Sequence, residues 1–403
     1  MKKYRISLTA LLSAVCLCLA ACAAGGTASN GESGEAPVGI AASSGQTGGA
    51  AATISSETEG SASGSTTAET TTLPSGTRPT QTTTAPSAAS VSRPAPTAAT
   101  TKTPVTAAPM TAAQKRDQVG FGFYRMGSIE DGLLEAIEEE AAKGHINTYM
   151  TGMAPYNFNN ALIMLHKVKE VGGMTWLGIA ETAFLFTQPV QLIENWKQNL
   201  QTMMDTIEQE GLMDSVLGFY FDEPMLCGIK KPEFRDVTRY LRERWPELRV
   251  MTVFAVNAIS PDVWSSGNDQ LLDHDTTQYL TDAGYDMYGS VAGDAINTYR
   301  KVNADLKTRL GRDDVRIWYV PCIMSYHGST DQKYAIDHLE AMFSFLREEK
   351  NPGGLMCYAY DISNRDGIGN IGFRELRERE KNPWTTLEDW LLYVGSETIK
   401  MKK

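Results

Sequence analysis

The feature that most constrains the fold is a succession of eight short β-rich runs, each followed by a helical segment, between residue 119 and the C-terminus. We expect strands at 119–125, 146–152, 175–181, 216–223, 249–256, 285–291, 316–323 and 354–361. Helical patterns occupy 129–144, 155–171, 187–211, 231–245, 270–283, 293–310, 330–349 and a segment from about 371. Strands separated by helices pair in parallel through right-handed crossovers. The pattern therefore predicts an α/β fold, a closed (β/α)8 TIM barrel.

An open doubly wound sheet is the alternative arrangement of such units, and it has less support. No strand is followed by the glycine-rich fingerprint of a dinucleotide site. The Gly120-Phe121-Gly122 stretch lacks the third glycine and the helix that would have to follow it. We predict no cofactor.

The N-terminus has the organisation of a secretory signal. Lys2, Lys3 and Arg5 precede an apolar stretch at 6–19, which is too short for a stable membrane-spanning helix. The stretch ends in Leu-Ala-Ala-Cys, which resembles the lipobox of bacterial lipoproteins. That resemblance implies a signal peptide at 1–22, lipidation of Cys22, and anchoring to the outer face of the bacterial cytoplasmic membrane. The alternative is an ordinary secretory signal with an incidental cysteine.

Residues 23–112 are rich in Ser, Thr, Ala, Gly and Pro and contain almost nothing that can pack into a core. Such a composition predicts a disordered stalk with an end-to-end distance of roughly 50 Å. Residues 113–403 contain every tryptophan of the chain and form the predicted barrel domain, which we expect to be monomeric.

The charge and the cysteines limit the partners of this domain. A net charge of −11 argues against a nucleic-acid partner. The three cysteines Cys227, Cys322 and Cys357 do not form a disulfide framework. Cys322 and Cys357 lie at similar heights of the last two strands, either as a close pair or as two buried thiols.

Active sites of such barrels lie at the C-terminal ends of the strands. We expect substrate-binding residues there, and they are mostly carboxylates and tyrosines: Tyr124, Arg125, Glu181, Asn257, Trp264, Asp286, Tyr288, Tyr326, His327, Tyr360 and Asp361. Carboxylates exchange protons, and aromatic rings stack on the apolar faces of sugars. The mixture favours a carbohydrate substrate, although some of these residues will only hydrogen bond loop backbones.

Metal chemistry has little support. The histidines show no zinc-ligand spacing. Serine-hydrolase chemistry has no support either, because no Gly-x-Ser-x-Gly elbow lies at a strand end. The acidic "DHD" cluster at 273–275 is interpreted as a helix cap or surface feature, so we predict no metal.

The "FDEP" stretch ends the fourth strand in two carboxylates, Asp222 and Glu223. Because Pro224 follows, we expect Glu223 to be extended, and the two side chains to diverge unless the strand bends. Glycoside hydrolysis commonly uses two carboxyl groups, one of them a proton donor. Glu181, Asp286 or Asp361 are alternative partners of Glu223. A salt bridge with Arg125 is the structural alternative.

Two families resemble this stretch. "DEP" resembles the Asn-Glu-Pro of the large retaining-glycosidase superfamily, but strand seven lacks the nucleophilic carboxylate expected there before Asp331. "YFDEP" resembles glycoside hydrolase family 123 and related hexosaminidases, in which the acetamide of the substrate is the nucleophile. This resemblance implies that Glu223 is the acid and base, that Asp222 orients the acetamide, and that Tyr288 or Tyr326 holds its oxygen.

We therefore expect a surface-anchored glycoside hydrolase acting on an extracellular poly- or oligosaccharide. The alternatives are a non-catalytic glycan-binding lipoprotein on the same scaffold and a structural or adhesive surface protein. The amphipathic C-terminal segment with Trp384 and Trp390 is expected to pack on the barrel.

Overall fold

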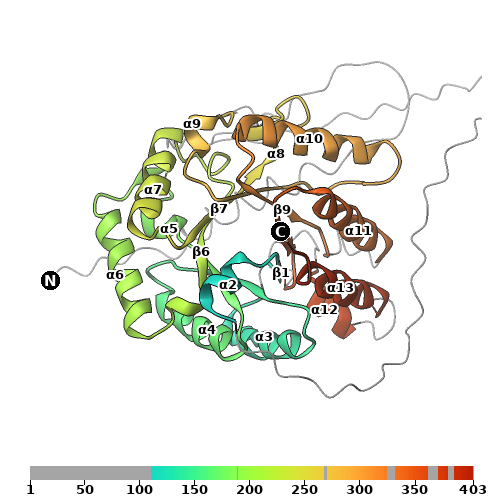
Figure 1. Cartoon of the computed structure of the whole chain (residues 1–403), viewed down its shortest axis with the longest axis horizontal. Helices are drawn as coiled ribbons and strands as arrows, with labels where there is room; N and C mark the ends of the chain where they lie inside the picture. Colours follow the sequence, from blue (N-terminus) through green and yellow to red (C-terminus); the bar gives the residue numbers. More distant parts are fainter. Residues whose placement is uncertain are drawn as a thin grey trace, which may run out of the picture. The chain divides into compact units, whose positions relative to one another are not determined.

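The computed structural model describes residues 110–402 except 125, 188, 267–269, 325–331, 362–370 and 380–384. The predicted signal peptide, Cys22 and nearly all of the predicted stalk lie outside the described residues. Eight parallel strands close into a barrel, which confirms the predicted fold (Figure 1). The barrel strands are β1 (Gly120–Phe123), β2 (Thr148–Gly152), β3 (Met174–Gly178), β6 (Val216–Asp222), β7 (Arg249–Ala255), β8 (Asp282–Asp286), β9 (Arg316–Val320) and β10 (Pro352–Cys357). Their order around the barrel is β1-β10-β9-β8-β7-β6-β3-β2.

Helices surround the strands (Figure 1). The longer ones are α3 (Leu133–Ala142), α4 (Phe158–Glu170), α6 (Trp196–Gln209), α7 (Lys231–Arg244), α10 (Ala295–Leu310), α11 (Gln332–Glu348) and α13 (Thr385–Thr398). The short ones are α2 (Ala112–Asp117), η1 (Ile129–Asp131), α5 (Ala180–Ala183), η2 (Met213–Ser215), α8 (Val256–Ile259), α9 (His274–Thr277) and α12 (Phe373–Arg379). A two-stranded hairpin, β4 (Phe184–Leu185) with β5 (Gln191–Leu192), precedes α6.

The barrel interior is filled by large side chains. Trp176 and Trp318 are fully buried and meet edge to face, with ring centroids 5.8 Å apart. The Trp318 indole fits because two neighbours lack a side chain: a Cβ at Gly120 or at Gly353 would lie 2.3 Å from it. This dense layer fills the barrel below the C-terminal strand ends.

The N-terminal end of the barrel is closed by an ion-paired cluster. Arg249 on β7 forms a bidentate pair with Asp282 on β8, and its guanidinium lies over the Trp176 ring at 5.1 Å. Helix α2 covers this end, where the backbone oxygen of Arg116 accepts hydrogen bonds from Arg249 and Arg316, both at 3.0 Å. These contacts satisfy the buried charges, so this end of the barrel is a structural one.

Several expected strands end three to five residues early, and two expected helices differ more from the structure. Instead of a helix at 270–283, only the single turn α9 forms, and β8 begins at Asp282, three residues before the expected start. The reason is tertiary, since Asp282 must lie in the barrel to pair with Arg249. Instead of a helix from 187, the chain first forms the β4–β5 hairpin, and α6 begins at Trp196.

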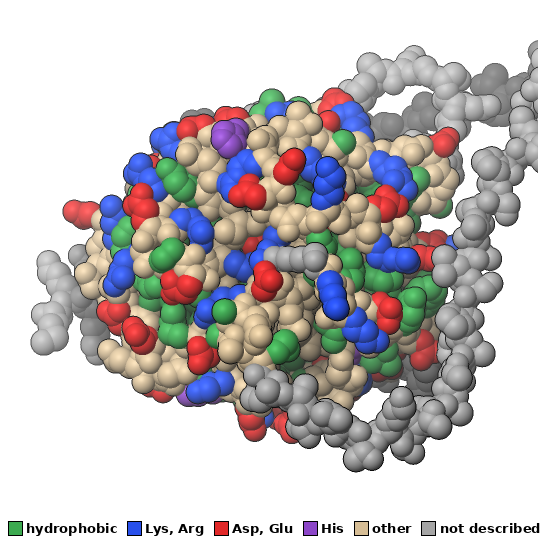
Figure 2. Space-filling model, in the orientation of Figure 1, with side chains coloured by type: hydrophobic (Ala, Val, Ile, Leu, Met, Phe, Trp, Pro, Cys, Tyr) green, Lys and Arg blue, Asp and Glu red, His purple; other side chains and the backbone are tan. Residues whose placement is uncertain are grey.

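The C-terminal helix α13 packs against α11 and β1 and buries Leu387, Leu391 and Val394, as expected from its amphipathic sequence. Cys322 and Cys357 are both buried thiols, and no disulfide joins them. Among the described residues, no helix has the length and apolar character needed to cross a membrane. On the face seen in Figure 2, side chains of both charge signs are interspersed.

Candidate functional site

A cavity of about 500 Å³ opens at the C-terminal ends of β1, β2, β3 and β6. Its floor is formed by strand-end residues, including Tyr124, Gly178, Tyr220 and Asp222. Its outer wall comes from the segments that follow β1 and β2: Met126, Gly127, Ser128, Ile129, Glu130, Ala154, Tyr156, Asn157 and Asn160. The cavity thus occupies the end of the barrel at which (β/α)8 enzymes carry their active sites.

Asp222 is an exposed carboxylate at the floor of this cavity. It is the last residue of β6, and its Oδ1 accepts hydrogen bonds from Tyr220 at 2.6 Å and from Tyr124 at 3.0 Å. Two phenol donors favour the ionised form of a carboxylate and fix its orientation. In return, burial and the charge of Asp222 raise the pKa of Tyr124, which therefore stays a donor.

Glu223 follows directly but has a different environment. Its side chain is buried, and its φ of 39° makes it the only non-glycine residue with a positive φ among the described residues. The expectation of an extended backbone before Pro224 was therefore wrong. The Glu223 N–H donates to Val253 O and its carbonyl accepts from the Cys227 N–H, both at 2.9 Å, so the chain turns sharply here. Backbone strain of this kind persists where the surroundings enforce it, often at functional sites.

The bend brings Glu223 into hydrogen-bond contact with Asp286, the last residue of β8. A hydrogen bond between two carboxyl groups requires one shared proton. Burial, then the charge of Asp222, raise the pKa of Asp286 to about 7, while hydrogen bonds from Glu223 and Tyr288 oppose the increase. The three carboxyl groups predicted at the ends of the fourth and sixth strands, Asp222, Glu223 and Asp286, thus interact with one another, and we call them the carboxyl cluster.

A series of tyrosine rings surrounds this cluster. Tyr220 contacts Tyr124, Tyr124 contacts Tyr358, and Tyr358 stacks on Tyr288 with centroids 5.1 Å apart and planes 16° apart. Tyr288 also donates a hydrogen bond to Asp286. The mouth of the barrel therefore combines carboxylates with aromatic faces, the composition expected from the strand ends.

The segment after β8 is held from outside the barrel by a buried histidine. His338 on α11 accepts the Cys322 N–H at Nδ1, 3.1 Å away, and its Nε2 lies 3.1 Å from Met287 O. The Tyr299 hydroxyl on α10 lies 3.1 Å from Met287 O and 3.0 Å from Gly289 O, and these two carbonyls share its one hydrogen. Because Nδ1 is an acceptor, the ring is neutral and protonated at Nε2, and burial lowers its pKa to about 4. This network fixes the backbone on both sides of Tyr288.

The other predicted site residues are distributed more widely. Glu181 lies in the cavity wall and accepts a hydrogen bond from Tyr156 at 2.7 Å. Asp361 is half-buried beside Gly127, a cavity residue, and lies 3.6 Å from Arg374. Arg125, Tyr326 and His327 lie outside the described residues.

Three predicted residues are not brought to the cluster. Tyr360 is fully buried between the barrel and the helices, and its hydroxyl donates to Glu140 at 2.9 Å. Asn257 is fully buried in α8, where its amide nitrogen donates to Ser266 at 2.7 Å. Trp264 packs against the outer core.

Several site residues were missed from the sequence. Tyr220 has the same strand parity as Asp222, so strand alternation could have identified it as inward-facing. Tyr358 comes one residue after β10 ends, where alternation no longer applies. Tyr156, Asn157 and Asn160 belong to the segment after β2, and no sequence signal marked them.

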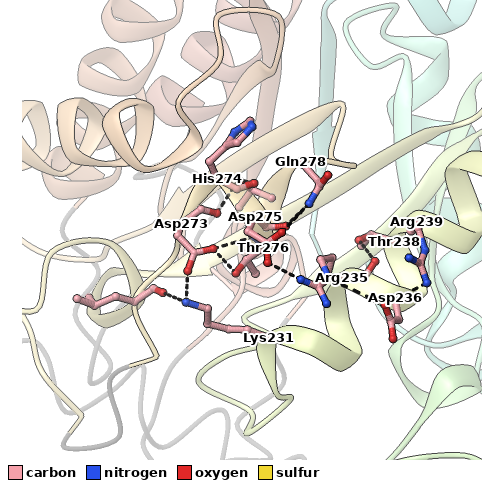
Figure 3. Close-up of polar contacts among 12 residues, drawn as sticks. Lys231, Arg235, Asp236, Thr238, Arg239, Asp273, His274, Asp275, Thr276 and Gln278 are labelled. Atoms are coloured by element: carbon pink, nitrogen blue, oxygen red, sulfur yellow. Dashed lines mark hydrogen bonds and ion pairs between the residues drawn. The ribbon is translucent and has the colours of Figure 1, made fainter.

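The 273–275 cluster lies elsewhere and is a helix cap, as predicted. Asp273 accepts the Thr276 N–H at 2.8 Å at the start of α9 and pairs with Lys231 on α7, while Asp275 pairs with Arg235 (Figure 3). His274 Nδ1 bonds to Leu310 O at 2.9 Å. In the described part of the chain, no group of three or more His, Cys, Asp and Glu side chains is arranged to hold a metal ion.

Comparison with known proteins gives matches in structure. No family model matches the chain, and no curated protein matches its sequence. Among solved structures, a β-glucuronidase from Bacteroides uniformis is similar at a TM-score of 0.42 and 12% identity, over 62% of this chain and 32% of that one. A cold-adapted β-galactosidase from Rahnella sp. R3 is similar at a TM-score of 0.46 and 11% identity, over 72% and 57%.

The chain thus spans about a third of the glucuronidase and somewhat over half of the galactosidase. Solved structures with which it shares similarity include glycoside hydrolases. The barrel itself is established by the strand pairing described above, and the residues of the site carry the argument about function.

Proposed function

We propose that the protein is a glycoside hydrolase acting on an extracellular poly- or oligosaccharide. The observation that carries the proposal is the pair of adjacent carboxyl groups at the C-terminal end of β6. Asp222 lines a cavity of about 500 Å³ and accepts hydrogen bonds from two phenols, and Glu223 is buried directly after it. Glycosidic bonds are cleaved between a proton donor and a second carboxyl group or its equivalent.

Glu223 is the proposed proton donor. Its hydrogen bond to Asp286 keeps a proton at the mouth of the barrel, and burial keeps that proton from bulk water. Asp222, which accepts hydrogen bonds from two phenols, is suited to stabilise positive charge that develops on the sugar.

Glu223 and Asp286 do not flank a scissile bond while they are hydrogen bonded, because the contact leaves no room for an anomeric carbon between them. Asp222 is then the second carboxylate. In the mechanism suggested by the hexosaminidase resemblance, an N-acetylhexosaminide supplies its own acetamide oxygen as nucleophile, and Asp222 orients the acetamide.

A glycan-binding protein without catalysis is the second candidate. Asp222 lines the cavity, whereas Glu223 is buried and directed to Asp286. An acid that never leaves Asp286 would give a cavity that binds sugar without cleaving it.

The test is hydrolysis of a panel of aryl glycosides and N-acetylated oligosaccharides by the purified protein. We expect turnover of N-acetylhexosaminides to fall by about 10² or more in Glu223→Gln and in Asp222→Asn. Glu243→Gln, an exposed carboxyl group on α7, is the control and should leave turnover unchanged. Turnover only of sugars without an acetamide would remove substrate assistance, and glycan binding with no turnover would support the second candidate.

We also propose that Cys22 carries a lipid and that residues 23–112 tether the barrel to the membrane surface. Metabolic labelling with a fatty-acid analogue should mark the parent chain and fail to mark Cys22→Ala. Labelling of both would contradict the anchor.

A further inference from the structure

The outer wall of the cavity contains an exposed aromatic ring that the proposed chemistry does not use. Tyr156 follows β2, is 65% exposed, and lines the cavity. It is the most exposed of the large apolar side chains in the described part of the chain. A ligand that covered this ring would remove apolar surface from water, which is favourable, and the position of the ring in the cavity lining places it where a ligand can do so.

The ring is held in position. The Tyr156 hydroxyl donates to Glu181 Oε2 at 2.7 Å, and Glu181 belongs to α5, which follows the next strand. The hydroxyl end of the ring is thereby held while most of the side chain stays exposed. An aromatic platform that is fixed before binding loses little conformational entropy when a sugar stacks on it.

The cavity also has a definite charge. Three of its lining residues are carboxylic acids, Glu130, Glu181 and Asp222, and none of its described lining residues is Lys or Arg. The side-chain amides of Asn157 and Asn160 supply donors and acceptors for hydroxyl groups. A sugar that carries its own carboxylate would be repelled here, whereas neutral or amino sugars would not.

We propose that this cavity is a glycan subsite next to Asp222, in which Tyr156 is the stacking platform and the acidic wall selects neutral or amino sugars over uronic acids. The inference rests on the proposed function and adds its substrate class. It also implies that the preferred substrate extends along the segments after β1 and β2, on one side of the barrel mouth.

Calorimetric binding tests the proposal on the full chain carrying Glu223→Gln, which prevents turnover of the probes. The probes are a β-1,4 tetramer of N-acetylglucosamine, the same tetramer without acetyl groups, and a tetramer of a uronic acid. We expect the first two to bind at least 10-fold more tightly than the third. Adding Tyr156→Ala should weaken their binding at least 10-fold, while Tyr156→Phe, which keeps the ring, should stay within about 3-fold.

Tyr393→Ala is the matched control, because Tyr393 is a 43% exposed tyrosine on α13 outside the cavity. It should leave all three affinities unchanged. Three results would overturn the proposal. The uronic acid tetramer could bind as tightly as the neutral tetramer, Tyr156→Ala could bind the probes as tightly as the parent, or no probe could bind at all.

Hydrolysis of the same probes by the wild-type chain separates this inference from the proposed function. Hydrolysis with binding that does not depend on Tyr156 would remove the subsite and leave the hydrolase. Binding that depends on Tyr156 without any hydrolysis would remove the hydrolase and leave the subsite.

Discussion

Strand β8 begins and ends with an aspartate, and the two have opposite electrostatic environments. Asp282 is fully buried and accepts hydrogen bonds from Arg249 and from Trp318 Nε1, the latter at 2.8 Å. Although burial opposes it, the charges of Arg249 and Arg316 lower the pKa of Asp282. At the other end, burial and Asp222 raise the pKa of Asp286.

The difference lies in what each carboxyl group faces. Asp282 faces guanidinium groups and an indole N–H, so its charge is compensated and its role is to close the barrel. Asp286 is buried near the charge of Asp222, with no cation of the described chain among the causes of its pKa shift, so the pKa is raised although hydrogen bonds from Glu223 and Tyr288 oppose the increase. Carboxyl clusters with raised pKa values are costly to folding, and they are characteristic of sites that move protons.

The largest effect on stability is expected when the ion pair of Asp282 with Arg249 is broken. Arg249→Met keeps an apolar chain over the Trp176 ring but leaves Asp282 buried without its ion pair. We expect a loss of about 3–5 kcal/mol in the free energy of unfolding, measured by urea denaturation at pH 7.5. The double variant Arg249→Met/Asp282→Asn should lose less, because no uncompensated charge remains. A loss below about 1 kcal/mol in the single variant would contradict the structural role of this end.

At the C-terminal end of β8, replacing the carboxyl group of Asp286 by an amide should stabilise the protein at high pH. The folded protein binds a proton at Asp286 up to about pH 7, whereas the unfolded chain releases it near pH 4. The free energy of unfolding therefore falls as pH rises from about 4 to about 7. Above pH 7 the proton on Asp286 no longer stabilises the fold. Asp286→Asn should be more stable than the parent by roughly 1–3 kcal/mol at pH 8 and equal to it near pH 4.

Asp282→Asn is the matched control for that experiment. Its effect on the free energy of unfolding should have the opposite sign and the opposite dependence on pH. The folded-state pKa of Asp282 is lowered, so its contribution is present at neutral pH and is lost as pH falls below about 4. The variant should be less stable than the parent at pH 8, and the gap should close in acid. Equal pH profiles for the two variants would remove the contrast between the two strand ends.

The sequence predicted the barrel well because its signals are local. Eight apolar runs alternating with helical patterns specify eight parallel strands, and the rule for strand ends then predicted that Tyr124, Asp222, Asp286 and Tyr288 lie at the mouth of the barrel, where the structure has them. The helix expected at 270–283 failed because the strand that begins at Asp282 is specified by Arg249, 33 residues earlier. Local helix or strand propensity contains no information about a partner that is so distant in the sequence.

The finer geometry of the site depended on contacts that the sequence does not encode locally. The bend at Glu223 opposes the preference of a residue before proline, and it exists because Val253 and Cys227 bond its backbone. Tyr360 was expected at the mouth but bonds Glu140 in the outer layer, because the chain leaves the strand after Cys357. Tyr156 lies in a loop segment, where neither alternation nor helical period predicts direction.

A smaller effect is expected from His338, the histidine that holds the segment after β8 at the C-terminal end of the barrel. His338 is neutral, so its contribution is lost as pH falls from about 6.5, the unfolded-state pKa, toward about 4. His338→Gln keeps one donor and one acceptor but does not titrate. We expect it to be less stable than the parent by about 1 kcal/mol at pH 7.5 and no less stable at pH 5 in thermal unfolding. An acid sensitivity identical to the parent's would exclude His338 as its source.

The smallest effect is expected at the exposed ion pair between α7 and α9. Lys231 and Asp273 are 31% and 47% exposed, so water screens their attraction, in contrast to Arg249 and Asp282 at 7% and 0%. Lys231→Ala should change the free energy of unfolding by less than about 1 kcal/mol, and 0.5 M salt should abolish the difference. The same salt should leave the loss in Arg249→Met almost unchanged, because a buried pair is screened much less. If salt reduced the losses in Lys231→Ala and in Arg249→Met equally, Arg249 and Asp282 would have to be more accessible to water than their burial indicates. The contrast between the two ends of β8 would then depend only on the carboxyl groups around Asp286.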